Sequence, residues 1–232
     1  MTVATAERTS NIITYTYVEP VYGLNYNKGY IGFTYDGDNP IAQGIAYFTK
    51  WDKIDMIRAT HVLIVTGEDS CIEASGSDKH VHETPLAPYF EQSTKQIFFR
   101  KPVGLTGEVA ERIVQTLRPE IGKTYDFFLI MAHALVGTVP GHVIDRLSGD
   151  KLSVSLCKLL DNPNSYICSE LAAYALDQQP EYRDKGVLAL PDSTINPQQL
   201  FEDDVIFEAW KTEVPKSYRK IPMPDRQPAL TR

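Results

Sequence analysis

The pattern of hydrophobic and polar positions divides the chain into a strand-rich first part and a helix-rich second part. Residues 60–66 are β-branched and apolar, the turn-forming residues 67–70 end this run, and residues 71–75 follow as a return strand. A third strand is expected at residues 96–100, because Pro102 stops the pattern there. The N-terminal part, rich in tyrosine, threonine and glycine, also favours strands and turns over helix.

Helical spacing of apolar residues starts after the third strand. Thr106 can cap a helix that runs to about Pro119, and Gly122 can close it. Residues 127–135 predict a second, almost wholly apolar helix, and residues 166–176 predict a third. Because strands come first and helices second, the sequence predicts an α+β domain with an antiparallel sheet, not an alternating βαβ sheet.

The composition changes again near the C-terminal end. Proline and basic residues, among them Lys216 and Arg226, accumulate from Pro215 onward. A length of 232 residues suits one domain of ordinary size. We therefore expect one domain over residues 1–214 and a Pro-rich basic tail over residues 215–232 that is extended or mobile.

Charge and cysteine content narrow the class of protein. A net charge of −7 argues against a nucleic-acid partner, since such binders usually carry a basic excess. Three cysteines do not make a disulfide framework and fit a reducing compartment. The start of the chain lacks the apolar stretch of a signal peptide, and the longest apolar run, residues 127–136, is too short to cross a bilayer. We expect a cytoplasmic protein without a transmembrane segment.

Cys168 is the first candidate for a catalytic residue. Helical spacing places it in the first turn of the third helix, on the face of Leu171 and Ala175, where Ser165 or Asn164 can serve as the N-cap. The unpaired N–H groups of a first turn favour a thiolate and can bind an oxyanion. Position alone slightly favours a different interpretation, in which the side chain is a small buried hydrophobic residue.

His61 and Glu73 are polar residues within apolar strands. If the hairpin centres on Gly67, His61 lies directly opposite Glu73 on one face, and a register two residues different leaves them diagonal neighbours. A carboxylate beside an imidazole fixes its tautomer and stabilises its cation. Taken alone, the pair is explained more simply as an ion pair at a sheet edge. Cys71 in mid-strand and Cys157 in a short apolar segment are expected to be core residues.

Taken together, Cys168, His61 and Glu73 supply a nucleophile, a general base and an orienting carboxylate, the three roles that acyl transfer through a thioester needs. The pair His80 and His82 could bind a metal, but no cluster of further ligands accompanies it, so a solvated loop is expected there. The sequence therefore predicts no metal and no cofactor.

Four short blocks resemble the circularly permuted papain-like cysteine hydrolases of the NlpC/p60 superfamily, in the YiiX/LRAT-like branch. They follow the family's order over residues 28 to 205, and the chain departs from the family at Gly29-Tyr30-Ile31, where members often have "GDi". The blocks are Thr60–Val65 with Cys71–Ala74, similar to "sHvgiv…viEA", Gly122–Asp126, similar to "GkpYD", Tyr166–Leu171, similar to "yCSEL", and Ile195–Leu200, similar to "tPddL".

The resemblance implies a permuted papain-like fold, in which an antiparallel sheet carrying the base precedes the nucleophile helix. It implies that Cys168 is the nucleophile, His61 the general base and Glu73 the third polar residue. The expected activity is hydrolysis of an amide in a peptide or cell-wall-type fragment, with a small peptide, amino-acid-containing or acyl substrate. Alternatives are a lipid acyltransferase or thioesterase on the same three residues, a non-catalytic ligand-binding module, and a partner-binding protein that uses the basic tail.

Overall fold

The computed structural model describes residues 16–18, 21–36, 59–75, 78–91, 95–125, 165–209 and 213–215. The strands are β1 (Thr16–Val18), β2 (Ile31–Asp36), β3 (His61–Val65), β4 (Ser70–Ser75), β5 (His80–Pro85), β6 (Lys95–Arg100), β7 (Thr124–Tyr125), β8 (Ser165–Tyr166) and β9 (Glu213–Pro215). The α-helices are α2 (Ala87–Glu91), α3 (Gly107–Leu117), α7 (Cys168–Asp177) and α8 (Pro197–Phe201). Three short 3₁₀ helices are η1 (Arg118–Glu120), η2 (Gly186–Ala189) and η3 (Asp192–Thr194).

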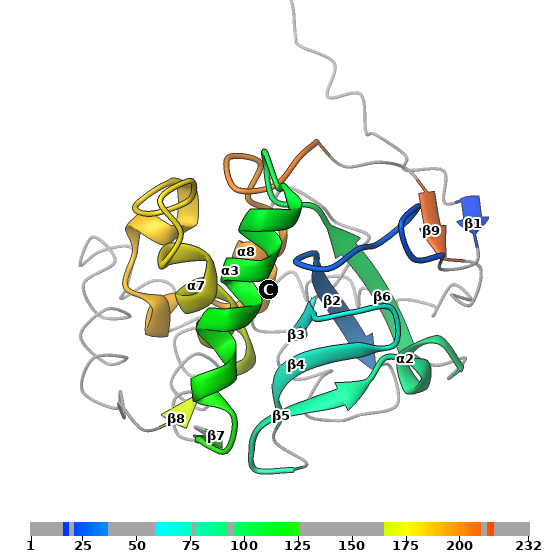
Figure 1. The fold of residues 1–232 in the computed structure, drawn as a ribbon, viewed down its shortest axis with the longest axis horizontal. Helices are drawn as coiled ribbons and strands as arrows, with labels where there is room; N and C mark the ends of the chain where they lie inside the picture. Colours follow the sequence, from blue (N-terminus) through cyan, green and yellow to red (C-terminus); the bar gives the residue numbers. More distant parts are fainter. Residues whose placement is uncertain are drawn as a thin grey trace, which may run out of the picture.

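The main sheet has seven strands in the order β6-β2-β3-β4-β5-β7-β8. Neighbouring strands are antiparallel from β6 to β7, and the last pair, β7 and β8, is parallel. Strands β1 and β9 form a separate parallel pair from opposite ends of the chain (Figure 1). This arrangement confirms the α+β class that the order of strands and helices predicts.

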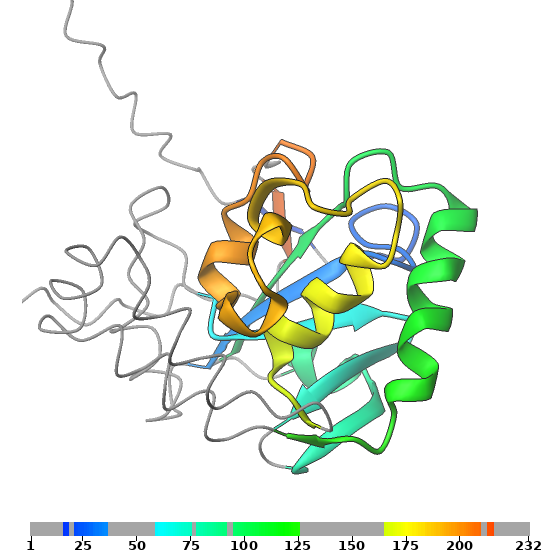
Figure 2. The same cartoon turned by 90° about the vertical axis from the view of Figure 1, so that its left-hand side faces the viewer.

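Both faces of the central strands are buried, which explains why the apolar run in β3 does not alternate with polar residues. Val62 and Ile64 belong to the larger core, beneath α3, α7 and α8. Leu63 and Val65 point to the opposite face and pack with residues near α2. Figure 2, seen from the side of α7 and α8, has these two helices in front of the strands.

Helix α3 agrees with its sequence pattern. The Oγ1 of Thr106 accepts a hydrogen bond from the N–H of Val109 at 3.3 Å, so the predicted cap is present. The apolar face, which includes Ile113 and Leu117, is buried against the sheet and α7. Gly122 follows η1 with a φ of +93°, a backbone conformation that favours glycine and lets the chain turn into β7.

The β3–β4 hairpin differs from the expected register. Leu63 pairs with Glu73, so His61 lies diagonally from Glu73 and not directly opposite it. The cause is the turn, in which the N–H of Thr66 donates to the carbonyl of Ser70 at 2.9 Å and the two hydroxyl oxygens are 2.7 Å apart. Because Thr66 and Ser70 stay paired, the hairpin centres on residue 68 and not on Gly67.

Two further expectations are corrected. His80 and His82 do not lie in a solvated loop; they belong to β5, which pairs along the whole length of β4. Helix α7 begins at Cys168, and Ile167 occupies the N-cap position in place of Ser165 or Asn164. Ser165 is unavailable as a cap because β8 pairs with β7, which keeps the backbone extended as far as Ile167.

Some sequence predictions fall on residues outside the described ranges. These are the apolar helix at 127–135, Cys157, and the tail beyond residue 215. The predicted boundary between the domain and the tail, at residues 214 and 215, falls inside β9. Because the described residues end there, the division into a domain and a tail stays a prediction. Within the described part of the chain, none of the helices combines the length and the hydropathy that a membrane crossing requires.

Candidate active site

Three polar side chains from three elements meet where α7 starts against the sheet. His61 is the first residue of β3, Glu73 lies in β4, and Cys168 is the first residue of α7. The Nε2 of His61 contacts the Oε2 of Glu73, and the His61 ring is hydrogen bonded to the Cys168 thiol. Since Nε2 faces the carboxylate, Nδ1 is the ring nitrogen that remains for the thiol. The structure therefore brings all three predicted site residues into one chain of contacts.

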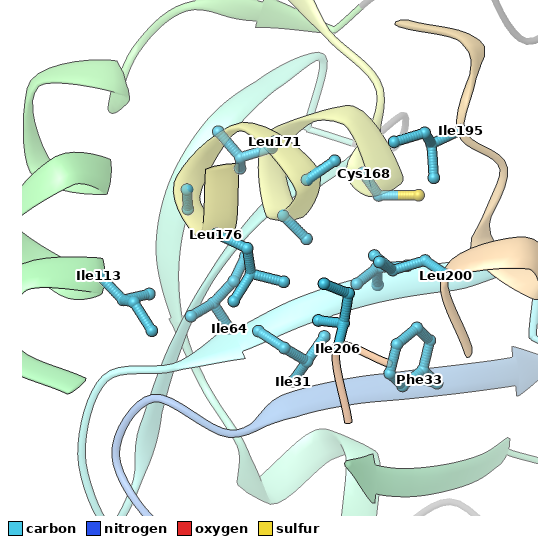
Figure 3. Packing of buried hydrophobic residues seen from close by; sticks show 14 of the residues in the cluster. Ile31, Phe33, Ile64, Ile113, Cys168, Leu171, Leu176, Ile195, Leu200 and Ile206 are labelled. Atoms are coloured by element: carbon cyan, nitrogen blue, oxygen red, sulfur yellow. The ribbon is translucent and has the colours of Figure 1, made fainter. Parts of the chain in front are cut away.

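Cys168 lies within the apolar core, and only 4% of its surface is exposed. Figure 3 shows it at the first turn of α7, with Ile195 and Leu200 on the same side of the helix. The N-cap residue Ile167 provides no side-chain oxygen for the first-turn N–H groups, and the Glu170 carboxylate instead reaches back to the N–H of Ile167 at 3.2 Å. Cys168 therefore lies in the first turn of α7, at the positive end of the helix dipole, where the N-cap side chain satisfies none of the N–H groups.

His61 is held between two groups that stabilise its charged form. Its side chain is 22% exposed, which makes it more accessible than Glu73, at 6%, or Cys168. Burial alone lowers the pKa of His61, but the Glu73 carboxylate and the Cys168 thiol outweigh it and raise the pKa to about 10. The imidazolium is thus the favoured form near neutral pH.

Glu73 is a buried carboxylate with several donors around it. The hydroxyl of Tyr89 donates to Oε2 at 2.5 Å, and the Nε2 of His82 lies 3.5 Å from Oε1. Burial alone raises the pKa of Glu73, but His61, Tyr89 and His82 together lower it. The carboxylate therefore stays ionised and orients His61.

Sequence reasoning missed Tyr89, and it did not connect His82 with Glu73. The two residues Glu73 and His82 are direct partners in the β4–β5 register, so assigning residues 80–85 to a strand after Ser75 would have paired them. Tyr89 gave no such signal, because it reaches Glu73 from a short helix whose position depends on tertiary packing.

The second described cysteine has a different environment. Cys71 lies inside β4, is fully buried and belongs to the core on the α2 side of the sheet, as the sequence predicts for a packing residue. Burial, reinforced by the nearby carboxylates of Glu73 and Glu83, raises the pKa of the Cys71 thiol well above its ordinary value. This thiol is consequently held in its unreactive form.

The histidine pair considered as metal ligands lies beside the site. His82 contacts Glu73 and also approaches Asp78, whose Oδ2 is 3.6 Å from the ring Nε2, while the rings of His80 and His82 are 5.3 Å apart. Among the residues that the structure describes, no group of three or more histidine, cysteine, aspartate or glutamate side chains is arranged to hold a metal ion.

Comparison with known proteins does not assign the chain to a family. Neither a protein-family model nor a curated protein matches the chain. A solved structure that this chain resembles weakly is YiiX from Escherichia coli O157:H7, described as a metalloprotein, with 17% sequence identity and a TM-score of 0.49. The match covers 81% of this chain and 98% of that one. A similarity of this size assigns no function to this chain.

Proposed function

We propose that this chain is a cysteine hydrolase that cleaves amide bonds through a thioester intermediate. The observation that carries the proposal is the continuous contact from the Cys168 thiol through the His61 ring to the Glu73 carboxylate. A nucleophile, a general base and an orienting group in hydrogen-bond reach of one another form the arrangement that nucleophilic catalysis requires.

The first half of the reaction forms the acyl-enzyme. The sulfur of Cys168 bonds to the carbonyl carbon of the substrate as a thiolate, because its proton already resides on the His61 imidazolium. The tetrahedral intermediate collapses, the carbon–nitrogen bond breaks, and His61 returns the proton to the departing amine. First-turn N–H groups of α7 are suitably placed to stabilise the oxyanion that forms between these steps.

The second half restores the enzyme. His61 takes a proton from water as the water oxygen bonds to the thioester carbon. The carbon–sulfur bond then breaks, the acid product leaves, and Cys168 is released as a thiolate beside the His61 imidazolium. Glu73 stays ionised throughout and stabilises the His61 imidazolium that forms in each half.

The arrangement of elements supports placing the chain among the circularly permuted papain-like hydrolases of the NlpC/p60 superfamily. Strands β3 and β4, which carry the base and the carboxylate, precede the helix that carries the nucleophile. The substrate proposed on this basis is a small peptide or a cell-wall-type fragment.

A lipid acyltransferase or thioesterase is the second candidate, and one observation favours it. Ile195 and Leu200 are fully buried and lie on the same side of α7 as Cys168, so the thiol has apolar neighbours that suit an acyl chain. Comparing turnover of peptide amides with turnover of long-chain thioesters separates the two candidates. The proposed amidase requires the amides to be cleaved faster.

Labelling with iodoacetamide, read by intact mass, tests the proposal. We expect one rapid modification, mapped to Cys168, that is absent in Cys168→Ser and falls by about 10²-fold or more in His61→Ala. Cys71→Ser is the matched control, because it removes a buried thiol of the same domain and should leave the rapid modification unchanged. Equal, slow labelling of all three cysteines would contradict the proposal. Rapid labelling without turnover of any acyl compound would instead favour the non-catalytic binding module.

A further inference from the structure

Tyr89 places a phenol hydroxyl on the oxygen of Glu73 that also binds His61. Its hydroxyl donates to Oε2 at 2.5 Å, and the same Oε2 contacts the Nε2 of His61. The Tyr89 and His61 rings are nearly parallel, with centroids 6.4 Å apart and an interplanar angle of 13°. One carboxylate oxygen thus joins the two rings.

The position of Tyr89 is fixed by the β3–β4 hairpin itself. Its N–H donates to the carbonyl of Leu86 at 2.9 Å, and the N–H of Leu86 donates to the carbonyl of Asp69 in the hairpin turn at 2.9 Å. Tyr89 also packs against the core on this side of the sheet, together with Phe90. Helix α2 is therefore anchored to the hairpin that carries both His61 and Glu73.

We propose that Tyr89 is a positioning residue that fixes the Glu73 carboxylate and, through it, the orientation of the His61 ring. The inference rests on the proposed function. A carboxylate bound through one oxygen to a single partner can rotate about its side-chain torsions. A second donor on that oxygen, carried by a ring held in an apolar core, removes this freedom.

Tyr89 is better suited to this role than the other groups around Glu73. The groups that face the carboxylate are His61 on β3, His82 on β5, Tyr89 on α2 and the Cys71 thiol on β4 itself. His82 lies at 3.5 Å from the other oxygen, which is longer than a normal hydrogen bond. Burial and the charge of Glu73 raise the pKa of Tyr89, so its hydroxyl remains a donor over the whole working range of pH.

The test compares Tyr89→Phe with Tyr26→Phe. Tyr26 is a matched control, because it belongs to the same core and its hydroxyl also makes one hydrogen bond, to the backbone carbonyl of Glu68 at 2.8 Å. Both substitutions remove one hydroxyl and keep the ring. Only the first removes a donor from Glu73.

Two readouts are measured in both variants. The pKa of Glu73 is followed by carbon-13 NMR of its carboxyl carbon, assigned with Glu73→Gln, and should rise by about one unit in Tyr89→Phe alone, the size expected for one hydrogen bond to a charged group. The rate of Cys168 alkylation by iodoacetamide should fall by about tenfold in Tyr89→Phe alone, with the acid limb of its pH profile moved upward.

Three results would overturn the inference. They are a Glu73 titration and an alkylation profile that are both unchanged in Tyr89→Phe, equal changes in Tyr26→Phe, or a shifted Glu73 titration with unchanged alkylation of Cys168. The NMR titration does not depend on thiol chemistry. If the wild-type protein shows no rapid modification of Cys168, the proposed function fails, while the carboxyl titration still decides whether Tyr89 holds Glu73.

Discussion

Two of the charged side chains that the described part of the molecule buries, Glu73 and Arg100, have different kinds of partner. Only 4% of Glu73 and 2% of Arg100 is exposed. Glu73 faces His61, whose ring can gain or lose a proton, as well as His82 and Tyr89. Arg100 donates to the carbonyl oxygens of Phe201 and Glu208, at 2.5 and 3.0 Å, which have no proton to exchange.

The Glu73 carboxylate supports the proposed chemistry, whereas the Arg100 guanidinium supports the fold. Arg100 joins β6 to the segment after α8, and its guanidinium also lies 5.2 Å from the centre of the Phe207 ring. Its contacts with the two carbonyl oxygens hold distant segments together whatever the pH. The contacts of Glu73 change the protonation of His61, next to the only described cysteine at a helix start. A buried charge is therefore informative about function mainly when its partners titrate.

The largest expected effect is on turnover in Glu73→Gln. The amide keeps the shape of the side chain but cannot stabilise the His61 imidazolium, so hydrolysis of p-nitrophenyl acetate should fall by about 10²–10⁴-fold. Glu83→Gln is the control, because Glu83 lies in the neighbouring strand and binds the hydroxyl of Thr66, at 2.8 Å, away from His61. Equal losses in both variants would remove the distinction between the two carboxylates.

Arg100→Met should show the opposite behaviour, with lower stability and unchanged chemistry. It leaves the carbonyls of Phe201 and Glu208 without their donor, and each such loss costs about 1–3 kcal/mol. We expect the free energy of unfolding in urea to fall by about 2–4 kcal/mol, and the rate of Cys168 alkylation in the folded protein to stay the same. An alkylation rate that fell with stability would show that the two regions are coupled.

A third effect is a dependence of stability on pH that belongs to the site. The pKa of His61 is raised from 6.5 to about 10, so its contribution is complete below pH 6.5 and is lost as the pH rises to about 10. The pKa of Glu73 is lowered from 4.5, so its contribution is present above pH 4.5 and is lost as the pH falls below it. Urea unfolding should show an alkaline loss of about 1.5–3 kcal/mol that disappears in His61→Ala and persists in Arg100→Met. An identical alkaline loss in His61→Ala would assign it to other groups.

The smallest effect is expected at Asp204. This carboxylate contacts Arg100 at 3.2 Å, but 69% of its side chain is exposed. Asp204→Asn should therefore reduce the free energy of unfolding by less than about 1 kcal/mol. A loss as large as that of Arg100→Met would show that the ion pair, and not the carbonyl contacts, makes Arg100 important.

The sequence was sufficient for some of these features and not for others. The strand pattern around His61 and Glu73 and the helix after Thr106 follow from local periodicity, which acts over a few residues. The hairpin register depends on a side-chain and backbone pairing between Thr66 and Ser70 that periodicity does not specify. The start of α7 depends on the pairing of β8 with β7, in which Thr124 pairs with the distant Ser165.

The sequence therefore predicted which three residues come into contact but not what surrounds them, and their role as a catalytic site stays a prediction. Cys168, His61 and Glu73 are chemically conspicuous in the sequence because each interrupts an apolar pattern or sits at a helix start. Tyr89 is one tyrosine among 13, and only the tertiary position of α2 distinguishes it from the others. The donor that holds the buried Glu73 carboxylate is therefore a residue that the sequence pattern does not single out.

Trapping of the acyl-enzyme shows whether Cys168 is a nucleophile. The protein is mixed with p-nitrophenyl acetate, quenched in acid and read by intact mass with peptide mapping. The account predicts a single acetyl group on Cys168 that appears and then decays in the wild-type protein, forms much more slowly in His61→Ala, and is absent in Cys168→Ser. Acetyl groups spread over lysines, with none on Cys168 at any time point, would contradict it.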